Sequence, residues 1–334
     1  MMKPTIYDVA SKANVSIATV SKVLNSSGRI SDETRKRVLK VIEQLNYQPS
    51  MMATALTGKS TFTIGLLIPD MANPFFAELT RNIEDRGHEL GYNLLICSTD
   101  YHPDKEQNYI ELLKRKSVDG IILASGFEKT SEVDKLVKEK FPVTIVARDF
   151  PSTYVNSVSL DDFQGGYEAT SYLIQLGHRQ IAVLARNVWS NRERMRGYEK
   201  ALEDHGLEKY DVFTFVEKST VEWGKKVATE YLRCGKPLTA IFACNDLLAS
   251  GAIQAARSRD LHVPNDISII GFDNTVIATL VDPQLTTMAQ PIRAMGREVM
   301  DLMVGEIKKE EQSKRRIVLS PTLVKRGSTA ELNK

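Results

Sequence analysis

Between Thr61 and the C-terminus, short apolar runs alternate with amphipathic stretches, and this alternation restricts the fold more than any other feature of the sequence. Strands that alternate with helix-length stretches build parallel sheets with helices packed on both faces. Continuous apolar runs are typical of strands that are buried on both sides. Such runs occur at 63–69, 93–98, 120–125, 143–148, 181–186, 239–244 and 267–272. The sequence therefore predicts a doubly wound α/β body.

The stretches between most of these runs have the length and apolar spacing of helices. We place helices at 75–90, 104–116, 163–176, 192–206, 222–234 and 247–259. A body of this size is large for one sheet, and the spacing of its runs indicates two similar halves that change near Ser159 to Gln164. No apolar run reaches the ~18 residues of a membrane span, so we expect no membrane segment.

The N-terminal part of the chain has a different pattern. The segment TIYDVASKANVSIATVSKVLN, Thr5 to Asn25, indicates two short helices around a tight turn. Asn14 can adopt the positive φ of such a turn, and the Ser16 hydroxyl can cap the second helix. That helix has an apolar face, which we expect to be buried, formed by Val20, Val23 and Leu24. This is the pattern of a helix-turn-helix domain.

The opposite face of the second helix is the one that a DNA major groove can admit. It is formed by Ala18 and Lys22 at its centre, Thr19 and Ser21 at its flanks, and Ile17 at its N-terminal end. A third helix follows, for which Ser31 is the expected cap. Its outer face is basic and carries Arg35, Lys36, Arg37 and Lys40.

Charge is distributed unevenly along the chain, although the formal net charge is only +2. Residues 1–60 hold nine Lys or Arg and four Asp or Glu, whereas the remainder holds 35 and 38. A basic segment suits a DNA reader, because phosphate contacts supply most of the non-specific affinity for DNA. A solvated helical face explains the charge alone equally well. The charge combined with the helix-turn-helix pattern favours DNA binding.

Thr5 to Asn25 contains the complete motif that is typical of LacI/GalR transcriptional regulators, and the N-terminus resembles their DNA-binding domain. In that family a segment ending in N-Y-x-P leads into a short hinge helix; here Asn46-Tyr47-Gln48-Pro49 precedes SMMATALTGK. The resemblance implies that Ala53 and Leu56 reach the minor groove, with Leu56 as a wedge that kinks the duplex. Thr54 stands where the family often has arginine, so a charged minor-groove contact is absent. Without the preceding motif, an ordinary packed linker helix would be the preferred interpretation.

The residues that we expect to bind DNA are Thr5, Ser16, Ile17, Ala18, Thr19, Ser21, Lys22, Asn25, Ala53 and Leu56. One such domain buries little DNA surface, so we expect a homodimer on a palindromic operator in double-stranded DNA. The tail after Pro321 has no leucine heptads, which favours a dimer over a coiled-coil tetramer.

Polar residues follow most of the predicted strands, and ligands of open α/β sheets bind outside the carboxyl ends of the strands. Polar residues also begin loops in any α/β protein, so a single position carries little weight. The body resembles the LacI/GalR effector domain, which is similar to periplasmic sugar-binding proteins, through NPFFAEL (73–79), RERMRGY (192–198), CND (244–246) and GFDN (271–274). The strand ends and the resemblance together nominate as effector-binding residues Phe75, Phe76, Asp149, Arg194, Ser219, Asn245 and Asp273.

Arg194 and Asp273 suit a small polar ligand, because guanidinium and carboxylate groups make directional, charge-assisted hydrogen bonds. Ser219 stands where several relatives carry an aromatic ring, which argues against stacking at this position; Trp223, one turn later, is better explained as a packing residue. We expect an effector of the sugar, sugar phosphate or nucleobase type. Some relatives respond instead to a phosphorylated partner protein, and the sequence leaves this alternative open.

The resemblance also divides the chain into a helix-turn-helix domain (1–49), a hinge helix and linker (50–60), and an effector-binding and dimerisation domain (61–334). It implies three crossings between two subdomains, near residues 160, 291 and 322. The N-subdomain then comprises 61–160 and 292–321, and the C-subdomain comprises 161–291 and 322–330. Several connections of this kind permit hinge bending while they keep the halves aligned.

Motifs of common enzymes are missing from the sequence. It has no G-x-x-x-x-G-K-S/T phosphate loop, no G-x-G-x-x-G after a strand and no G-x-S-x-G elbow. The five histidines are scattered, and Cys97, Cys234 and Cys244 have neither metal-binding nor redox spacing. We therefore expect no catalytic site, no cofactor and no metal, and free thiols in a reducing compartment.

The features together predict a sequence-specific DNA-binding transcriptional regulator that is controlled by an effector in the cleft between two α/β subdomains. Repression is the commoner outcome in the family that it resembles. The sequence begins without a signal peptide, so we expect the protein in the cytoplasm, associated with the nucleoid when it binds DNA. The alternative is a sugar-type solute-binding protein without a regulatory role.

Overall fold

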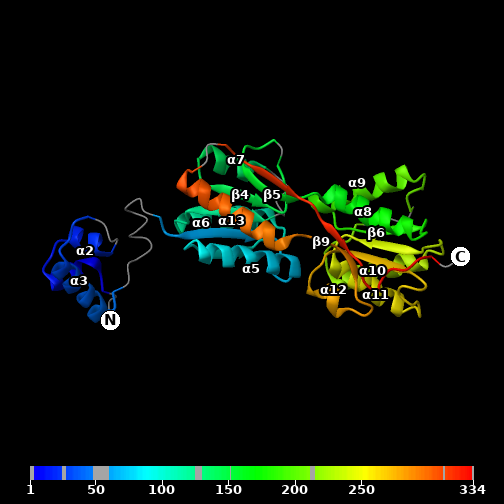
Figure 1. The fold of residues 1–334 in the computed structure, drawn as a ribbon, viewed down its shortest axis with the longest axis horizontal. Coiled ribbons are helices and arrows are strands. Elements are labelled where there is room, and N and C mark those ends of the chain that lie inside the picture. The colour runs from blue at the N-terminus through cyan, green and yellow to red at the C-terminus, as the bar shows by residue number, and fades with distance from the viewer. Residues whose placement is uncertain are drawn as a thin grey trace. The chain divides into compact units, whose positions relative to one another are not determined.

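A computed structural model describes residues 4–24, 28–47, 60–124, 130–150, 152–210, 215–310 and 313–332. The chain forms two compact units, Met1–Thr61 and Phe62–Lys334 (Figure 1). The predicted hinge helix lies outside the described residues, as do three of the candidate DNA-binding residues, Asn25, Ala53 and Leu56.

The first unit holds three helices in its described part, α1 (Ile6–Ala13), α2 (Ile17–Leu24) and α3 (Asp32–Leu45). Thr5 and Asp8 form a capping box that begins α1, and Asn14 ends it with the expected positive φ of 50°. The Ser16 Oγ accepts a hydrogen bond from the Thr19 amide (3.1 Å), and Ser31 caps α3. The predicted apolar faces form one core, whose buried residues are Val9, Ala10, Ala13, Val20, Val23, Val38, Val41 and Tyr47.

The second unit contains two sheets. The first sheet is parallel throughout and has the order β10-β5-β4-β3-β1-β2. Its strands are β1 (Thr63–Ile68), β2 (Asn93–Ser98), β3 (Gly120–Ala124), β4 (Val143–Val146), β5 (Asn156–Leu160) and β10 (Arg316–Leu319). Helices α5 (Pro74–Glu89) and α13 (Ile292–Lys308) pack side by side on one face, and α6 (Pro103–Arg115) and α7 (Ser131–Lys138) cover the other (Figure 1).

The second sheet has the order β11-β9-β8-β7-β6, and only β11 is antiparallel. Its strands are β6 (Ile181–Leu184), β7 (Ala240–Ala243), β8 (Ser268–Asp273), β9 (Thr286–Ala289) and β11 (Thr322–Val324). Helices α8 (Asp162–Gln175) and α9 (Trp189–Asp204) cover one face. The other face carries α10 (Val221–Arg233) and α11 (Asp246–Arg257), and the short α12 (Val276–Leu280) follows β8. Both sheets with their helices confirm the doubly wound α/β prediction.

The chain passes between the two sheets three times, from β5 to α8, from β9 to α13 and from β10 to β11. All three passages start or end at strands on one side of each sheet, namely β5 and β10 in the first and β9 and β11 in the second. The strands β2 and β6 form the opposite edges. The three crossings therefore lie on one side of both sheets, and the β2 and β6 edges lie on the other.

One strand prediction needs correction. All seven predicted runs become strands, but 93–98 is an edge strand rather than a buried one, and Leu95 and Ile96 are 37% and 39% exposed. The sequence analysis did not predict the strands β5, β9, β10 and β11, because they are short or polar. It also did not predict the helices α7, α12 and α13, because they lie outside the spacing of the main pattern. None of the helices in the described ranges is long and apolar enough to cross a membrane.

Glycines set the distance between two pairs of helices. A Cβ on Gly166 of α8 would lie 1.9 Å from the Arg194 carbonyl oxygen, and one on Gly197 of α9 would lie 2.0 Å from the Phe163 carbonyl oxygen. The α10–α11 pair repeats this arrangement with Gly224 and Gly251. In both pairs the helix backbones touch, so no larger residue fits without separating the helices.

Gly166→Ala is expected to lower the free energy of unfolding by about 2–3 kcal/mol or more, because the added methyl group collides with backbone rather than with a movable side chain. Gly305→Ala in α13 is the matched control, since a Cβ there meets no atom within 4 Å. That change should raise stability by about 0.5–1 kcal/mol through helix propensity. Urea unfolding of both variants measures the difference, and equal stabilities would contradict the close helix contact.

Candidate functional site

The exposed face of α2 is the candidate DNA-reading surface. Ile17, Ala18 and Lys22 are exposed there, and Thr19 and Ser21 are half-buried at its flanks. Ile17 is 41% exposed, which is unusual for a large apolar residue at the start of a helix. Thr5 and Ser16 begin α1 and α2, where the first helical amides point outward. This arrangement gives α2 a small, mostly uncharged reading surface with one cation.

Two further features of the first unit bear on nucleic acid. Tyr7 on α1 is 68% exposed, and the sequence reasoning did not select it, although an aromatic residue on the polar face of a short helix was a usable signal. On α3, Lys36, Arg37 and Lys40 are exposed and Arg35 is half-buried. These cations suit contacts with phosphates.

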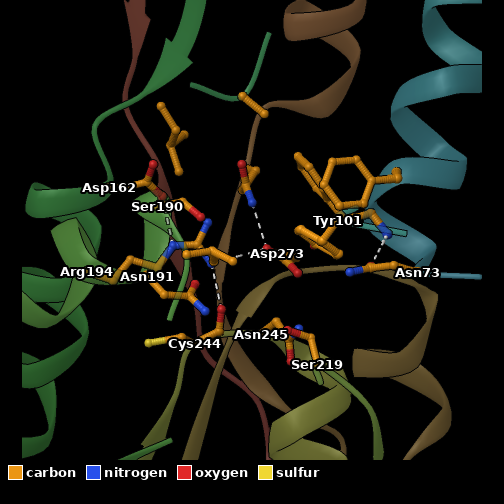
Figure 2. A pocket seen from close by; sticks show the side chains of 16 residues that line it. Asn73, Tyr101, Asp162, Ser190, Asn191, Arg194, Ser219, Cys244, Asn245 and Asp273 are labelled. Atoms are coloured by element: carbon orange, nitrogen blue, oxygen red, sulfur yellow. Dashed lines mark hydrogen bonds and ion pairs between the residues drawn. The ribbon is translucent and has the colours of Figure 1, made fainter. Parts of the chain in front are cut away.

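The second unit holds a cavity between its two subdomains, at the carboxyl ends of the strands (Figure 2). The N-subdomain contributes Asn73, Phe75, Phe76, Tyr101 and Ala147. Leu160 and Gln290 lie in crossing segments, and the C-subdomain contributes Asp162, Val188, Ser190, Asn191, Arg194, Ser219, Cys244, Asn245 and Asp273. The cavity has a volume of about 50 Å³. It is therefore a narrow cleft.

Six of the seven candidate effector residues line this cavity, namely Phe75, Phe76, Arg194, Ser219, Asn245 and Asp273. Asp149 does not. Its Oδ1 accepts a hydrogen bond from the Ser157 hydroxyl (3.0 Å) and lies 3.7 Å from the Arg316 Nε. The chain turns at Ala147, which has a φ of 59° and itself lines the cavity, so Asp149 returns toward the neighbouring strand β5.

Arg194 is the centre of the cavity wall. Its Nε donates a hydrogen bond to the Asp162 carboxylate (2.8 Å), and its Nη1 donates to the Cys244 carbonyl (2.6 Å). The guanidinium also stacks on the Phe272 ring, 3.6 Å from its centroid. Figure 2 shows Arg194 between Asp162 and Asp273. These contacts fix the orientation of the guanidinium in the wall.

Asp273 accepts a hydrogen bond from the Gln290 amide (2.6 Å) and lies 3.6 Å from the Arg194 Nη1. Its backbone has a φ of 109°, a conformation that a non-glycine residue adopts only under strain. Burial raises the pKa of Asp273 to about 8, although the nearby Arg194 acts in the opposite direction. Burial likewise raises the pKa of Asp162 to about 6 against the effect of Arg194. Burial therefore opposes the charged form of both carboxyl groups, and the Arg194 guanidinium offsets part of that effect.

Two amides at helix starts complete the polar wall. The Asn73 Oδ1 accepts from the Phe75 amide (3.0 Å), and the Asn245 Oδ1 accepts from the Leu248 amide (2.8 Å). Both side chains are thereby fixed with their amide nitrogens as donors. The Phe75 and Phe76 rings meet edge to face at 5.0 Å and form an apolar wall.

Several cavity residues were missed by the sequence reasoning, notably Tyr101, Asp162, Asn191 and Gln290. Asp161 caps α8 by accepting from the Gln164 amide (2.9 Å), and the next residue, Asp162, lines the cavity. Asp246 also stands apart: its carboxylate accepts from the Thr275 amide and the Thr287 hydroxyl, both at 2.7 Å, and burial raises its pKa to about 6. Asp246 thus holds the loop that carries Asp273.

Within the described ranges, no group of three or more His, Cys, Asp or Glu is arranged to hold a metal ion. Cys97, Cys234 and Cys244 form no disulfide.

Comparison with known proteins decides the family. Residues 5–50 match the model of bacterial regulatory proteins of the lacI family. Residues 61–326 match the model of periplasmic binding proteins and the sugar binding domain of the LacI family. The chain belongs to the LacI family.

This LacI-family chain is 45% identical over 337 residues to the HTH-type transcriptional regulator DegA of Bacillus subtilis (strain 168), covering 99% of this chain and 100% of DegA. Among solved structures, the Lac repressor dimer bound to operator and the anti-inducer ONPF has a TM-score of 0.85 at 26% identity, covering 98% of this chain and 100% of that one. The transcriptional regulator CelR–cellobiose complex has a TM-score of 0.74 at 29% identity, covering 97% and 99%.

These matches confirm the predicted family and the predicted architecture, a helix-turn-helix domain followed by a two-subdomain α/β body. The relatives are transcriptional regulators, so this LacI-family chain is a DNA-binding regulator of transcription and not an enzyme.

The stability of the chain is expected to fall as pH rises from about 4 to 8. Asp273 has its pKa raised to about 8 from 3.8, so the folded state keeps a proton that the unfolded chain loses, and the resulting stability disappears as pH rises through the folded value. Asp162 and Asp246, whose pKa values are raised to about 6, add to the fall at lower pH.

Asp273→Asn mimics the protonated form, so its melting temperature should change less than that of the wild type between pH 6 and 9. Melting curves across this range provide the measurement. Asp260→Asn, at an exposed site outside the cavity, serves as the control and should follow the wild type. A wild-type profile for Asp273→Asn would refute the buried, protonated carboxyl.

Proposed function

We propose that this regulator represses transcription by binding a palindromic operator as a homodimer, and that a small sugar-type effector in the cleft of each body changes its operator affinity. The observation that carries the proposal is the buried Asp162–Arg194–Asp273 cluster in the cleft of a chain that also has a helix-turn-helix domain. Repression is inferred from relatives such as the Lac repressor. Because a regulator must reach its operator DNA, we place the protein in the cytoplasm.

The chemistry of the cavity favours an uncharged, hydroxyl-rich effector. Among the lining residues that the structure describes, Arg194 is the one cation, and Asp162 and the Cys244 carbonyl already engage it. A phosphate group would find no unengaged cation in this wall, and its charge would also disfavour ionisation of the adjacent Asp162 and Asp273 carboxyl groups. Hydroxyl groups can instead exchange hydrogen bonds with Asp273, Asn245 and Asn73, while a sugar ring packs on Phe75 and Phe76. The CelR structure contains cellobiose, which is consistent with this class for a relative.

Exposed apolar residues support the homodimer. Leu95 and Ile96 lie on the unpaired edge of β2, and on α12 Val276 and Leu280 are 58% and 72% exposed. An unpaired strand edge with exposed leucine and isoleucine is a natural pairing surface. The Lac repressor structure is a dimer on its operator, and the same arrangement would place two reading helices on one palindrome.

On DNA, α2 would present Ile17 and Ala18 to thymine methyl groups and Lys22 to acceptors on base edges. Thr19 and Ser21 would contact neighbouring bases or phosphates, and Thr5, Ser16 and Asn25 would contact the backbone. Ala53 and Leu56 are proposed for the minor groove, with Leu56 as the wedge.

Lys22→Ala should change which operators are preferred, with a loss of about 1–3 kcal/mol at the base that Lys22 reads. Arg35→Ala is the matched control, because a phosphate contact should weaken all sequences alike and lower the salt slope by about one. Operators are selected from random duplexes, and binding is then titrated against salt. Identical effects of both variants would contradict the assigned roles.

A thermal-shift screen of the full chain should identify the effector class, since a ligand that binds only the folded state raises the melting temperature. The panel contains neutral sugars, sugar phosphates, nucleobases and amino acids, and we expect a neutral sugar to give the largest shift. Asp273→Asn should lose the shift and Asp260→Asn should keep it. A response only to sugar phosphates would contradict the uncharged class, and no response would favour a partner protein as the signal.

A further inference from the structure

One contact joins the two subdomains at the mouth of the cleft. The guanidinium of Arg186 lies over the ring of Tyr101, 3.7 Å from its centroid. Tyr101 follows β2 of the first sheet, whereas Arg186 follows β6 of the second. Tyr101 lines the cavity and Arg186 does not. Figure 2 shows Tyr101 on the α5 side of the cavity, opposite Asp162 and Arg194.

The position of this contact gives it leverage. β2 and β6 are the edge strands farthest from the three chain crossings, which all involve the opposite edges of the two sheets. When the subdomains rotate about the crossings, the mouth therefore moves more than the hinge side. A contact at the mouth is the first that must break when the cleft opens. Because it lies farthest from the chain crossings, it also opposes the rotation most strongly.

The loop that carries Tyr101 is held in an unfavourable conformation. Asp100 and Tyr101 both have positive φ, 54° and 60°, and consecutive non-glycine residues of this kind are strained. The Asp100 carboxylate stabilises the loop by accepting from the Ser98 hydroxyl (3.3 Å) and from Lys105. The Thr99 amide donates to the Ile68 carbonyl (2.9 Å), which ties the loop to β1. This backbone conformation points the Tyr101 ring toward Arg186 of the other subdomain.

Arg186 is fixed from its own side. The Val216 amide donates to Ala185 (2.9 Å), and Val216 forms a parallel bridge with Arg186. The Asn191 side-chain amide, in the cavity wall, donates to the Arg186 carbonyl (3.2 Å). The backbone position of Arg186 thus depends on a residue that an effector would touch.

The cavity is small while this contact holds. Its volume is about 50 Å³, whereas ligand pockets usually measure about 300–1,000 Å³. The Tyr101 ring takes part of the space, and burial raises the pKa of its hydroxyl to about 12, so the ring stays neutral. An effector can therefore bind only after the ring and the guanidinium separate or move together.

We propose that Tyr101 and Arg186 form a latch that holds the empty cleft closed and sets the affinity for the effector. The inference rests on the proposed effector function of the cleft, and it assigns to Arg186 a role without direct effector contact. Loss of the latch raises the population of open cleft, so that effector binds faster and more tightly.

Hydrogen exchange of the ligand-free full chain tests the latch directly. In Arg186→Ala and Tyr101→Leu, amides at 99–102 and 188–192 should exchange about three- to thirty-fold faster than in the wild type, as expected for loss of one cation–π contact. Tyr101→Phe keeps the ring but loses the hydroxyl interaction with Arg186, so its exchange should lie between that of the wild type and that of Tyr101→Leu. Arg192→Ala removes a nearby exposed arginine that contacts Asn187, and should also be unchanged. Unchanged exchange in both latch variants overturns the proposal.

A second measurement uses D-ribose and cellobiose as probes, together with any ligand from the thermal-shift panel. Arg186→Ala should bind the responding probe with a faster association rate. The association rate of the double variant with Tyr101→Leu should exceed that of neither single variant by more than the experimental error. Weaker binding in Tyr101→Leu with wild-type binding in Arg186→Ala would overturn the latch and make Tyr101 a direct wall residue. Faster exchange without any sugar response would support the latch and refute the sugar-type effector.

Discussion

The buried guanidinium of Arg194 is the interaction on which the second unit depends. An unpaired charge at this depth would be strongly unfavourable, so the surrounding structure has to supply partners from several elements. Asp162 at the start of α8, the carbonyl at the end of β7 and the Phe272 ring on β8 all meet Arg194 of α9. This convergence requires α8 and α9 to touch, and Gly166 and Gly197 permit that contact. In this subdomain, the close packing of α8 and α9 therefore also places the polar groups of the cleft.

The two sides of the cleft are built differently. The C-subdomain side is polar and rigid, with carboxylates, amides and the guanidinium fixed by mutual hydrogen bonds. The N-subdomain side is aromatic, with Phe75, Phe76 and Tyr101 on two different elements. A polar, pre-organised wall can fix the orientation of a ligand before the aromatic wall closes over it.

The sequence could predict the parts of the fold that follow from continuous apolar runs and helical spacing. The strand β5 was not predicted because its residues are partly polar. Asn156 and Ser157 are nevertheless buried, and their side chains donate hydrogen bonds to the carboxylates of Glu306 and Asp149. Asp149 lies outside the lining of the cavity because the chain turns at Ala147, and that turn cannot be predicted from residue types. Tyr101 was missed for a similar reason, since two adjacent left-handed residues aim its ring. Motifs locate a site to within a residue or two, whereas the loop backbone decides which side chain enters it.

The passage from β10 to β11 contains only Ser320 and Pro321. β10 is held in the first sheet by pairing with β5, and β11 is held in the second by pairing with β9. Leu319 and Thr322 can therefore be at most about 11 Å apart, whatever the cleft contains. The two lobes of the body can swivel about this tether but cannot part. Within the body, an effector of the proposed kind would therefore change the angle between the two subdomains and not the distance between them.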